Sequence, residues 1–172
     1  LKVGFKLRGQ TLNAIRGISL DLYEGESLAI VGESGSGKSV FTKTFMGLLE
    51  SNGYIDSGSI IYKEKDITKF KSEKEWLGIR GKEIAMVSQD PMTSLNPLKI
   101  VGKQVQEGIE LHQNLKGAEA KRHAIKLLKD VGIRDPEKRY SQYPHEFSGG
   151  MRQRVVIAIA IACNPKILVC DE

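Results

Sequence analysis

The sequence predicts an α/β protein in which a strand-rich first part is followed by a helical segment and a last strand. A glycine-rich loop, residues 32–39, stands between a strand-like run and apolar residues at helical spacing from Val40 to Leu49. Helical periodicity with charged outer faces then covers 101–115 and 118–131. The apolar run 167–170 is short enough for a buried strand. Together these patterns indicate a strand-rich core with a helical insertion.

Composition is that of an ordinary soluble globular domain. The 172 residues suffice for one compact domain with a core, with or without a small insertion. Hydrophobic residues make up 40% and charged residues 27%. The net charge of +5 is spread along the chain, which favours a solvated surface over a nucleic-acid or anionic-membrane site. No run approaches the roughly 18 apolar residues of a membrane span.

Cysteine and histidine usage argues against a disulfide framework and a histidine metal site. Cys163 and Cys170 lie in apolar surroundings and are interpreted as buried thiols in a reducing compartment. The three histidines are too dispersed for a shared ligand set. The chain starts at Leu1 without a signal-peptide pattern, and we expect a fragment at both ends.

The first third predicts strands and turns. Apolar runs flank the turn signal Glu24-Gly25, which predicts a hairpin whose second strand is Ser27 to Val31. "GSIIYKEKDIT", residues 58–68, predicts a second short hairpin. "KEIAMVSQ", residues 82–89, predicts a buried strand.

The second half predicts helices. "DPMTSLNP", residues 90–97, is a loop, and "RDPEKRYSQYPHEF", residues 134–147, interrupts the helical pattern with two prolines. Ser148 is a helix-capping residue, and Asn164-Pro165 ends the helix that follows it.

The glycine-rich loop fits the pattern G-x-x-x-x-G-K-[ST] at every fixed position. Glycines allow consecutive backbone N–H groups to wrap an anion, and the helix N-terminus faces the same phosphates. A flexible Gly/Ser loop would need neither the strand before it nor the helix after it, so phosphate binding is favoured. The nucleotide-binding residues are Gly32, Glu33, Ser34, Gly35, Ser36, Gly37, Lys38 and Ser39, with Lys38 for the β- and γ-phosphates and Ser39 for Mg²⁺.

The two acids that follow the last apolar run are either a solvated strand end or part of a catalytic site. In phosphate-loop folds, a second strand ends beside the loop with an Asp that holds Mg²⁺ through water. Asp171 is preceded by four apolar residues and matches that position. Glu172 is then placed to orient or deprotonate the attacking water.

Four motifs in this order resemble the ATP-binding cassette (ABC) ATPases: 32–39, Gln89 after a strand, "FSGGMRQR" (147–154) and "ILVCDE" (167–172). "SQDPMTSLNP" and "YPHEFSGGMRQR" resemble the versions in bacterial oligopeptide and dipeptide importers, a subgroup that includes nickel importers. The resemblance implies a P-loop NTPase fold, the ABC-type nucleotide-binding domain with an antiparallel β subdomain. One domain is expected over 1–172, with a nucleotide-binding core (1–89), a helical subdomain (90–163) and the strand before the two acids (164–172).

The resemblance also implies roles for further residues. Gln89 would contact Mg²⁺ and the attacking water, and Val40 would border the phosphates. The turn formed by Ser148, Gly149 and Gly150 would close on the ATP of a second cassette, paired head to tail.

Two assignments from the resemblance keep a plain structural alternative. Phe5 would stack on adenine, and its alternative is a core Phe. The surface that docks on membrane-embedded subunits is expected near Met92, Leu95, Asn96 and Pro97, whose alternative is a packed loop.

The expected activity is ATP hydrolysis, with ATP and Mg²⁺, that powers import of oligopeptides or dipeptides across the bacterial cytoplasmic membrane. The expected partners are a second ATPase subunit (homo- or heterodimer), transmembrane permease subunits and, indirectly, an extracytoplasmic binding protein, at the cytoplasmic membrane face. A nickel or other small-solute importer is an alternative, and a soluble ABC ATPase acting on nucleic acid or ribosomes is disfavoured. Because the γ-phosphate-sensing His of the family is not in this sequence, residues 1–172 alone are expected to hydrolyse ATP poorly.

Overall fold

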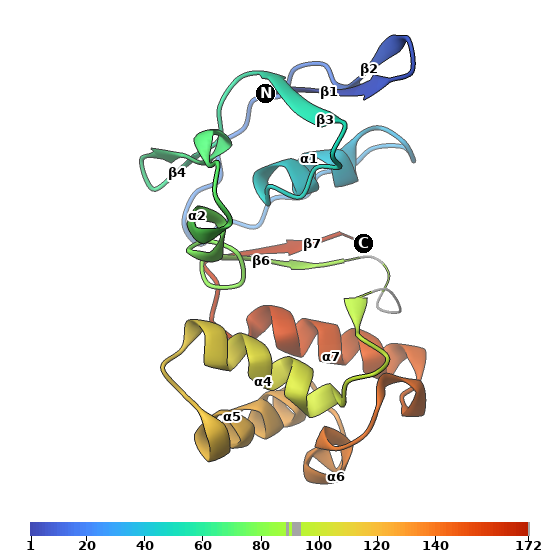
Figure 1. Ribbon diagram of the computed structural model, residues 1–172, viewed down its shortest axis with the longest axis vertical. Helices are drawn as coiled ribbons and strands as arrows, with labels where there is room; N and C mark the ends of the chain where they lie inside the picture. Colours follow the sequence, from blue (N-terminus) through green and yellow to red (C-terminus); the bar gives the residue numbers. More distant parts are fainter. Residues whose placement is uncertain (89, 91–93, 172) are drawn as a thin grey trace. The chain divides into compact units, whose positions relative to one another are not determined.

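A computed structural model describes residues 1–88, 90 and 94–171, which form two compact units, Leu1–Trp76 and Leu77–Glu172 (Figure 1). The strand β6 (Ile84–Val87) therefore groups with the helices of the second unit, whereas the sequence analysis drew its boundary after residue 89. The three-part division of the chain remains a prediction.

The first unit is built on a three-stranded antiparallel sheet. Its strands are β1 (Lys2–Leu7), β2 (Gln10–Ile15) and β3 (Gly53–Ser57), in the order β2-β1-β3. Gly9, with φ +79°, turns the chain between β1 and β2. The unit's buried apolar side chains are Val3, Ile15, Met46 and Ile67.

The helix α1 (Lys38–Phe45) is shorter than the pattern from Val40 to Leu49 predicts. It begins at Lys38, directly after Gly37 in the left-handed region, and ends before Gly47, whose φ is +62°. The Leu48 N–H donates to the Lys43 carbonyl (2.8 Å) and the Gly47 N–H to the Thr44 carbonyl (3.0 Å). This is a Schellman ending, so Gly47 terminates the helix although the apolar spacing continues.

Of the two predicted hairpins, one is confirmed and one is wrong. Residues 58–68 contain β4 (Ile61–Tyr62) and β5 (Lys65–Asp66), an antiparallel pair. Around Glu24-Gly25 the turn forms, with the Glu26 N–H donating to the Tyr23 carbonyl (3.1 Å), but 16–36 contains no strand. A strand exists only through hydrogen bonds to a neighbour, and the described residues supply none to 27–31. Val31 is accordingly 89% exposed.

The second unit combines a parallel strand pair with a helical layer. β6 pairs with β7 (Ile167–Cys170) in parallel register, Ile84 opposite Ile167 and Val87 opposite Cys170. The helices are α4 (Val101–His112), α5 (Gly117–Asp130), α6 (Pro136–Tyr140) and α7 (Gly149–Ile161), with the 3₁₀ turn η2 (Pro144–Glu146) before α7. The predicted helices and the strand at 82–89 are confirmed.

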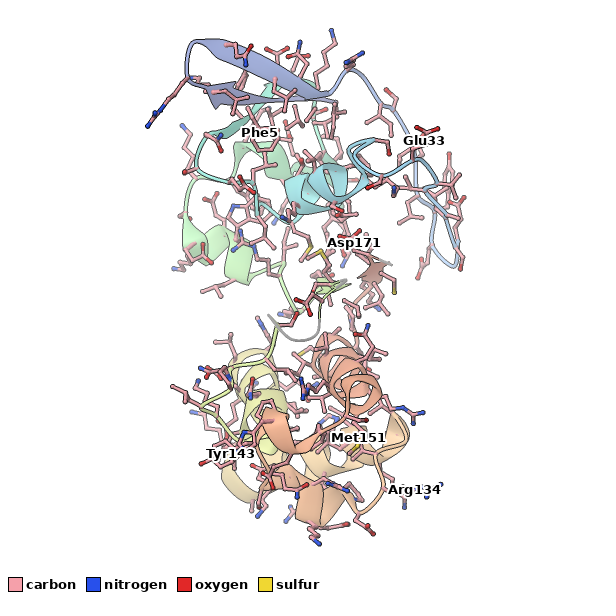
Figure 2. The ribbon with its side chains drawn as sticks, turned by 90° about the vertical axis from the view of Figure 1, so that its right-hand side faces the viewer. Phe5, Glu33, Arg134, Tyr143, Met151 and Asp171 are labelled. Carbon is pink, nitrogen blue, oxygen red and sulfur yellow. The ribbon has the colours of Figure 1, made fainter. Side chains whose placement is uncertain are left out.

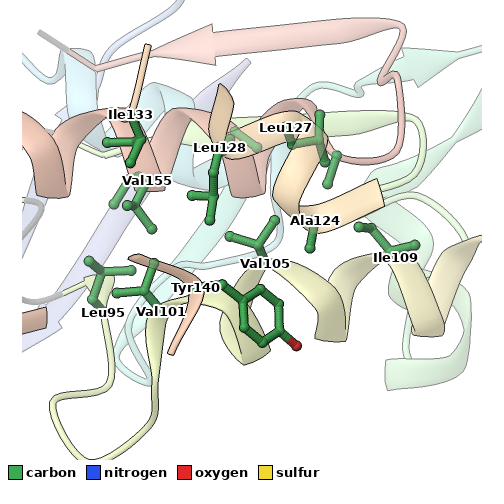
Figure 3. Packing of buried hydrophobic residues seen from close by; sticks show 14 of the residues in the cluster. Leu95, Val101, Val105, Ile109, Ala124, Leu127, Leu128, Ile133, Tyr140 and Val155 are labelled. Carbon is green, nitrogen blue, oxygen red and sulfur yellow. The ribbon is translucent and has the colours of Figure 1, made fainter. Parts of the chain in front are cut away.

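One apolar core joins these helices (Figure 3). Val101, Val105 and Ile109 project from α4 toward Leu128 on α5 and Val155 on α7, and all are fully buried. The spacing of these residues on α4, four apart, is the apolar stripe from which the helix was predicted. The other buried members include Leu95, Ala124, Leu127, Ile133, Tyr140 and Phe147.

A buried polar contact sits inside this core, where α6 meets α4. The Tyr140 hydroxyl donates to the Gln106 side-chain oxygen, and Gln106 donates to Glu110 (2.5 Å). Burial, and then the nearby Glu110 carboxylate, raise the pKa of Tyr140, and the Gln106 hydrogen bond lowers the pKa of Glu110. The bonds give the buried amide and hydroxyl partners, which such groups require.

The last strand is less buried than its apolar run predicts. Leu168 is 44% exposed and Cys170 is also exposed, while Ile167 and Val169 are half-buried. Among the described residues, β7 has only β6 as a paired neighbour, so alternate side chains face away from the packed side. The two thiols are free, as predicted, but Cys170 is not buried and Cys163 is only partly so.

Candidate functional site

The loop 32–39 folds as a glycine-dependent turn that leads into α1. Gly35 and Gly37 have φ values of +78° and +96°, a region that other residues rarely adopt. A Cβ on Gly37 would lie 2.9 Å from the Ala14 carbonyl oxygen. Both the backbone angle and this close contact therefore disfavour a side chain at residue 37. The Ser36 N–H donates to the Glu33 carbonyl (3.1 Å) and closes the turn.

Lys38 opens α1 and folds back over this loop. Its Nζ atom donates to the carbonyl oxygens of Gly32 (2.8 Å) and Glu33 (3.0 Å). An ammonium group, the N-terminal amides of an eight-residue helix and an exposed backbone turn thus occur together. This combination favours a polyphosphate, because each feature attracts negative charge or donates a hydrogen bond to it.

Ser39 and Val40, the next two predicted contacts, lie in the first turn of α1. Ser39 is exposed and Val40 is half-buried. A serine hydroxyl is a hard oxygen ligand of the kind that Mg²⁺ takes, so the residue type and its position fit the predicted metal role. Within the described residues, no group of three or more His, Cys, Asp or Glu side chains is arranged to hold a metal by itself.

The ends of β6 and β7 bring two other predicted segments together. The Asp171 N–H donates to the Val87 carbonyl (3.0 Å), which extends the ladder one residue beyond β7. Figure 2 labels Asp171 at the end of this strand. Because parallel strands leave a sheet at the same edge, the chain toward Gln89 starts next to Asp171. Gln89 and Glu172 themselves lie outside the described residues.

Hydrogen bonds connect described residues on both sides of Gln89. The hydroxyl groups of Ser88 and Ser94 are hydrogen-bonded (2.5 Å), and Ser94 donates to the Asp90 carbonyl (2.9 Å). Asp171 and the phosphate loop belong to different units, so their predicted proximity remains a prediction.

The Ser148-Gly149-Gly150 turn begins α7 and is exposed. The Ser148 hydroxyl accepts from the Met151 N–H (3.3 Å), so the predicted N-cap is confirmed. An added Cβ on either glycine would meet no heavy atom of the described residues within 4 Å. These glycines are therefore not required for packing within the chain, and they leave the backbone at the helix N-terminus accessible to an anion.

Phe5 is the residue predicted to contact adenine. Phe5 is half-buried in β1, with a ring carbon 3.0 Å from where a Cβ on Gly53 would lie. Its proposed contact with adenine remains a prediction.

In the predicted docking surface, Leu95 is buried at 4% exposure in the helical core and does not belong to a surface. Its side chain is apolar and fits the core next to α4. Asn96 and Pro97 are exposed, and Met92 lies outside the described residues. Leu98, which the sequence analysis did not single out, is 85% exposed.

Sequence reasoning also missed two arginines of α7. Arg152 donates through Nε to the carbonyl oxygens of Pro144 and Phe147, and Arg154 donates through Nη1 to those of Val131 and Gly132. The spacing R-x-R after the glycine turn was present in the sequence, but nothing local indicates which carbonyls each guanidinium reaches.

Comparison with known proteins gives a consistent picture. A family profile described as "ABC transporter" matches residues 15–172. The chain is 56% identical over 170 residues to the oligopeptide transport ATP-binding protein AmiE of Streptococcus pneumoniae, covering 99% of this chain and 48% of AmiE. It is 50% identical over 173 residues to the dipeptide transport ATP-binding protein DppD of Bacillus subtilis, covering 100% of this chain and 51% of DppD. The chain thus spans about half the length of these relatives.

A solved structure extends the similarity to the fold. The dimeric post-hydrolysis structure of the ATP-binding cassette MJ0796, bound to ADP and Pi, aligns with a TM-score of 0.81 at 28% identity. The alignment covers 99% of this chain and 71% of that one. Within the residues that our structure describes, no helix combines the length and apolar character needed to cross a bilayer.

Proposed function

The chain belongs to the ABC transporter family, and from that premise we propose that it is part of the ATP-binding, ATP-hydrolysing subunit of an oligopeptide or dipeptide importer. The observation that carries this proposal is the identity of 50–56% with oligopeptide and dipeptide transport ATP-binding proteins along 99–100% of the chain. The peptide cargo rests on those relatives.

In this proposal the first unit holds the nucleotide. The backbone turn 32–37 and the Lys38 ammonium bind the β- and γ-phosphates, and Lys38 exchanges its loop carbonyls for phosphate oxygens. Ser39, Gln89 and Asp171 are the residues that would hold Mg²⁺, which when bound neutralises charge that develops on the phosphoryl group. The half-buried Phe5 is the candidate for adenine.

Glu172 would accept the proton of the attacking water, and Gln89 would orient that water. The support is the parallel pairing of β6 and β7. The chain toward Gln89 leaves the end of β6, and the chain toward Glu172 leaves the adjacent end of β7. A carboxylate one residue beyond the metal-binding Asp is suited to act as a general base. None of the three histidines, His112, His123 and His145, follows this pair, so we also propose that residues 1–172 alone turn over ATP slowly.

The exposed Ser148-Gly149-Gly150 turn would complete the site of a second ATPase subunit, paired head to tail. The support is that both glycines are free of packing constraints and stand at a helix N-terminus. The dimeric ATP-binding cassette noted above has this chain's fold. Transmembrane permease subunits and, through them, an extracytoplasmic binding protein would be the remaining partners, at the cytoplasmic face of the membrane.

The test is the substitution Glu172→Gln in the full-length protein assembled with its permease. Loss of the general base is expected to lower kcat for ATP by roughly 10²–10⁴-fold, with ATP affinity unchanged. Phosphate release and binding of a fluorescent ATP analogue measure the two quantities. Glu137→Gln, at an exposed position on α6, is the matched control.

If kcat for ATP is unchanged in Glu172→Gln, Glu172 is not the general base. Uptake of labelled peptides and of nickel into vesicles that contain the assembled transporter decides the cargo. Uptake of nickel without peptide would overturn the peptide proposal and leave the family assignment intact.

A further inference from the structure

Arg152 ties the start of α7 to the chain segment that precedes it. One guanidinium N–H, on Nε, is shared between the carbonyl oxygens of Pro144 (2.9 Å) and Phe147 (3.0 Å). The backbone N–H of the same residue donates to the Ser148 carbonyl (2.9 Å). The bond to Ser148 is the backbone bond that any residue at 152 of α7 makes, whereas the side chain of Arg152 holds the carbonyls of Pro144 and Phe147, directly before the glycine turn.

The segment before the turn is itself well ordered by local bonds. The Glu146 side chain accepts from the Tyr143 N–H (2.7 Å), and the Phe147 N–H donates to the Pro144 carbonyl (3.1 Å). Pro144 and Phe147 are buried. Figure 2 labels Tyr143 before this segment and Met151 in the first turn of α7. The Arg152 side chain thus links an anchored segment to an exposed turn.

The glycine turn has a side-chain bond of its own, from the Met151 N–H to the Ser148 hydroxyl (3.3 Å). Ser148, Gly149 and Gly150 are all exposed, and the two glycines carry no side chain that packing can hold. To this bond the Arg152 side chain adds two more, to the carbonyl oxygens of Pro144 and Phe147 on the segment that leads into the turn. An anion site made of backbone amides depends on fixed donor positions, because an N–H group that shifts no longer points at the charge.

We propose that Arg152 is a positioning residue that holds the Ser148-Gly149-Gly150 turn in the shape that receives the γ-phosphate of a second subunit's ATP. The inference rests on the proposed function of that turn. Arg152 is not itself assigned a contact with nucleotide. Its action is through the carbonyls of Pro144 and Phe147.

Arg154 provides the matched control, since it lies on the same helix and also donates to two backbone carbonyls. Its bonds go to Val131 (3.2 Å) and Gly132 (3.0 Å) at the end of α5, away from the glycine turn. Arg152→Met and Arg154→Met each keep an apolar stem and lose the N–H donors. General loss of stability affects both variants, whereas loss of positioning is specific to Arg152→Met.

The experiment uses the full-length protein in its assembled transporter and combines two readouts. Amide hydrogen exchange over residues 146–152 is expected to become roughly three- to tenfold faster in Arg152→Met and to stay unchanged in Arg154→Met, as the loss of one or two hydrogen bonds predicts. The kcat for ATP is expected to fall roughly tenfold or more only in Arg152→Met, because displaced positioning groups have effects of up to about 10²-fold. Affinity for the chain's own ATP is expected to stay unchanged, and Arg152→Lys to restore part of the activity.

Unchanged exchange at 146–152 in Arg152→Met overturns the proposal, and so does a kcat equal to that of Arg154→Met. Gly149→Val tests the proposed function separately, since an added Cβ there meets no heavy atom of the described residues within 4 Å. If Gly149→Val leaves turnover unchanged, the role assigned to the turn is wrong. The exchange measurement then still decides whether Arg152 holds it.

Discussion

Lys38 satisfies its ammonium group with two carbonyl oxygens of its own loop, at 2.8 and 3.0 Å. The same group is assigned to phosphate, so binding would exchange neutral acceptors for charged ones. Charge-assisted hydrogen bonds of this kind contribute about 1.5–3 kcal/mol each. Lys38 therefore has a structural partner in the loop and a stronger one in the proposed ligand.

Replacing Lys38 with Ala is expected to weaken ATP binding by roughly 10- to 100-fold, since about 1.4 kcal/mol corresponds to a factor of ten. Titration with a fluorescent ATP analogue measures the dissociation constant. Lys43→Ala, an exposed position on the same helix, is the control and should leave the constant unchanged. An affinity for Lys38→Ala equal to that control would contradict phosphate binding by this loop.

Helix α4 packs closely against the ring of Tyr140 at Gly102. A Cβ on Gly102 would lie 2.0 Å from the Tyr140 ring, whereas a Cβ on Gly108 would meet no heavy atom within 4 Å. The two glycines lie on the same helix, and only Gly102 is buried. Gly102 therefore permits the close packing of α6 and the hydrogen bond from Tyr140 to Gln106.

Gly102→Ala is expected to lower the free energy of unfolding by about 1–3 kcal/mol, because the buried ring must shift to admit a methyl group. Gly108→Ala is expected to raise it by roughly 0.5–1 kcal/mol, the helix preference for Ala over Gly. Urea denaturation followed by circular dichroism measures both. Equal effects at the two positions would show that the Tyr140 contact does not limit residue 102.

At the scale of the whole molecule, burial is uneven along the chain. The helices α4, α5 and α7 share one continuous core, whereas 16–36 has no helix or strand and is mostly exposed. Amide exchange reports such differences, because protection follows the free energy of local opening. In the chain of residues 1–172, we expect amides inside α4, α5 and α7 to exchange on the order of 10³-fold more slowly than those at 18–34. Slow exchange at 27–31 would mean that these residues form a paired strand.

Features that depend on neighbouring residues could be predicted from the sequence. The loop 32–39, the helix cap Ser148 and the apolar spacing of α4, α5 and α7 are local patterns, and the structure has each of them. The short hairpin at 58–68 and the strand β6 were also predictable, from turn chemistry and an uninterrupted apolar run.

Features that depend on a distant partner could not be predicted, because they arise when the chain folds. The apolar run 27–31 resembles β6 in composition, yet no described residue pairs with it and it forms no strand. Cys170 is exposed because no described element covers its side of β7. Leu95 is buried because α4 and the other helices of the core surround it. Likewise, the carbonyls that Arg152 and Arg154 reach are set by where η2 and α5 end. Pairing and burial are relations between segments far apart in the chain, and a local residue pattern does not contain them.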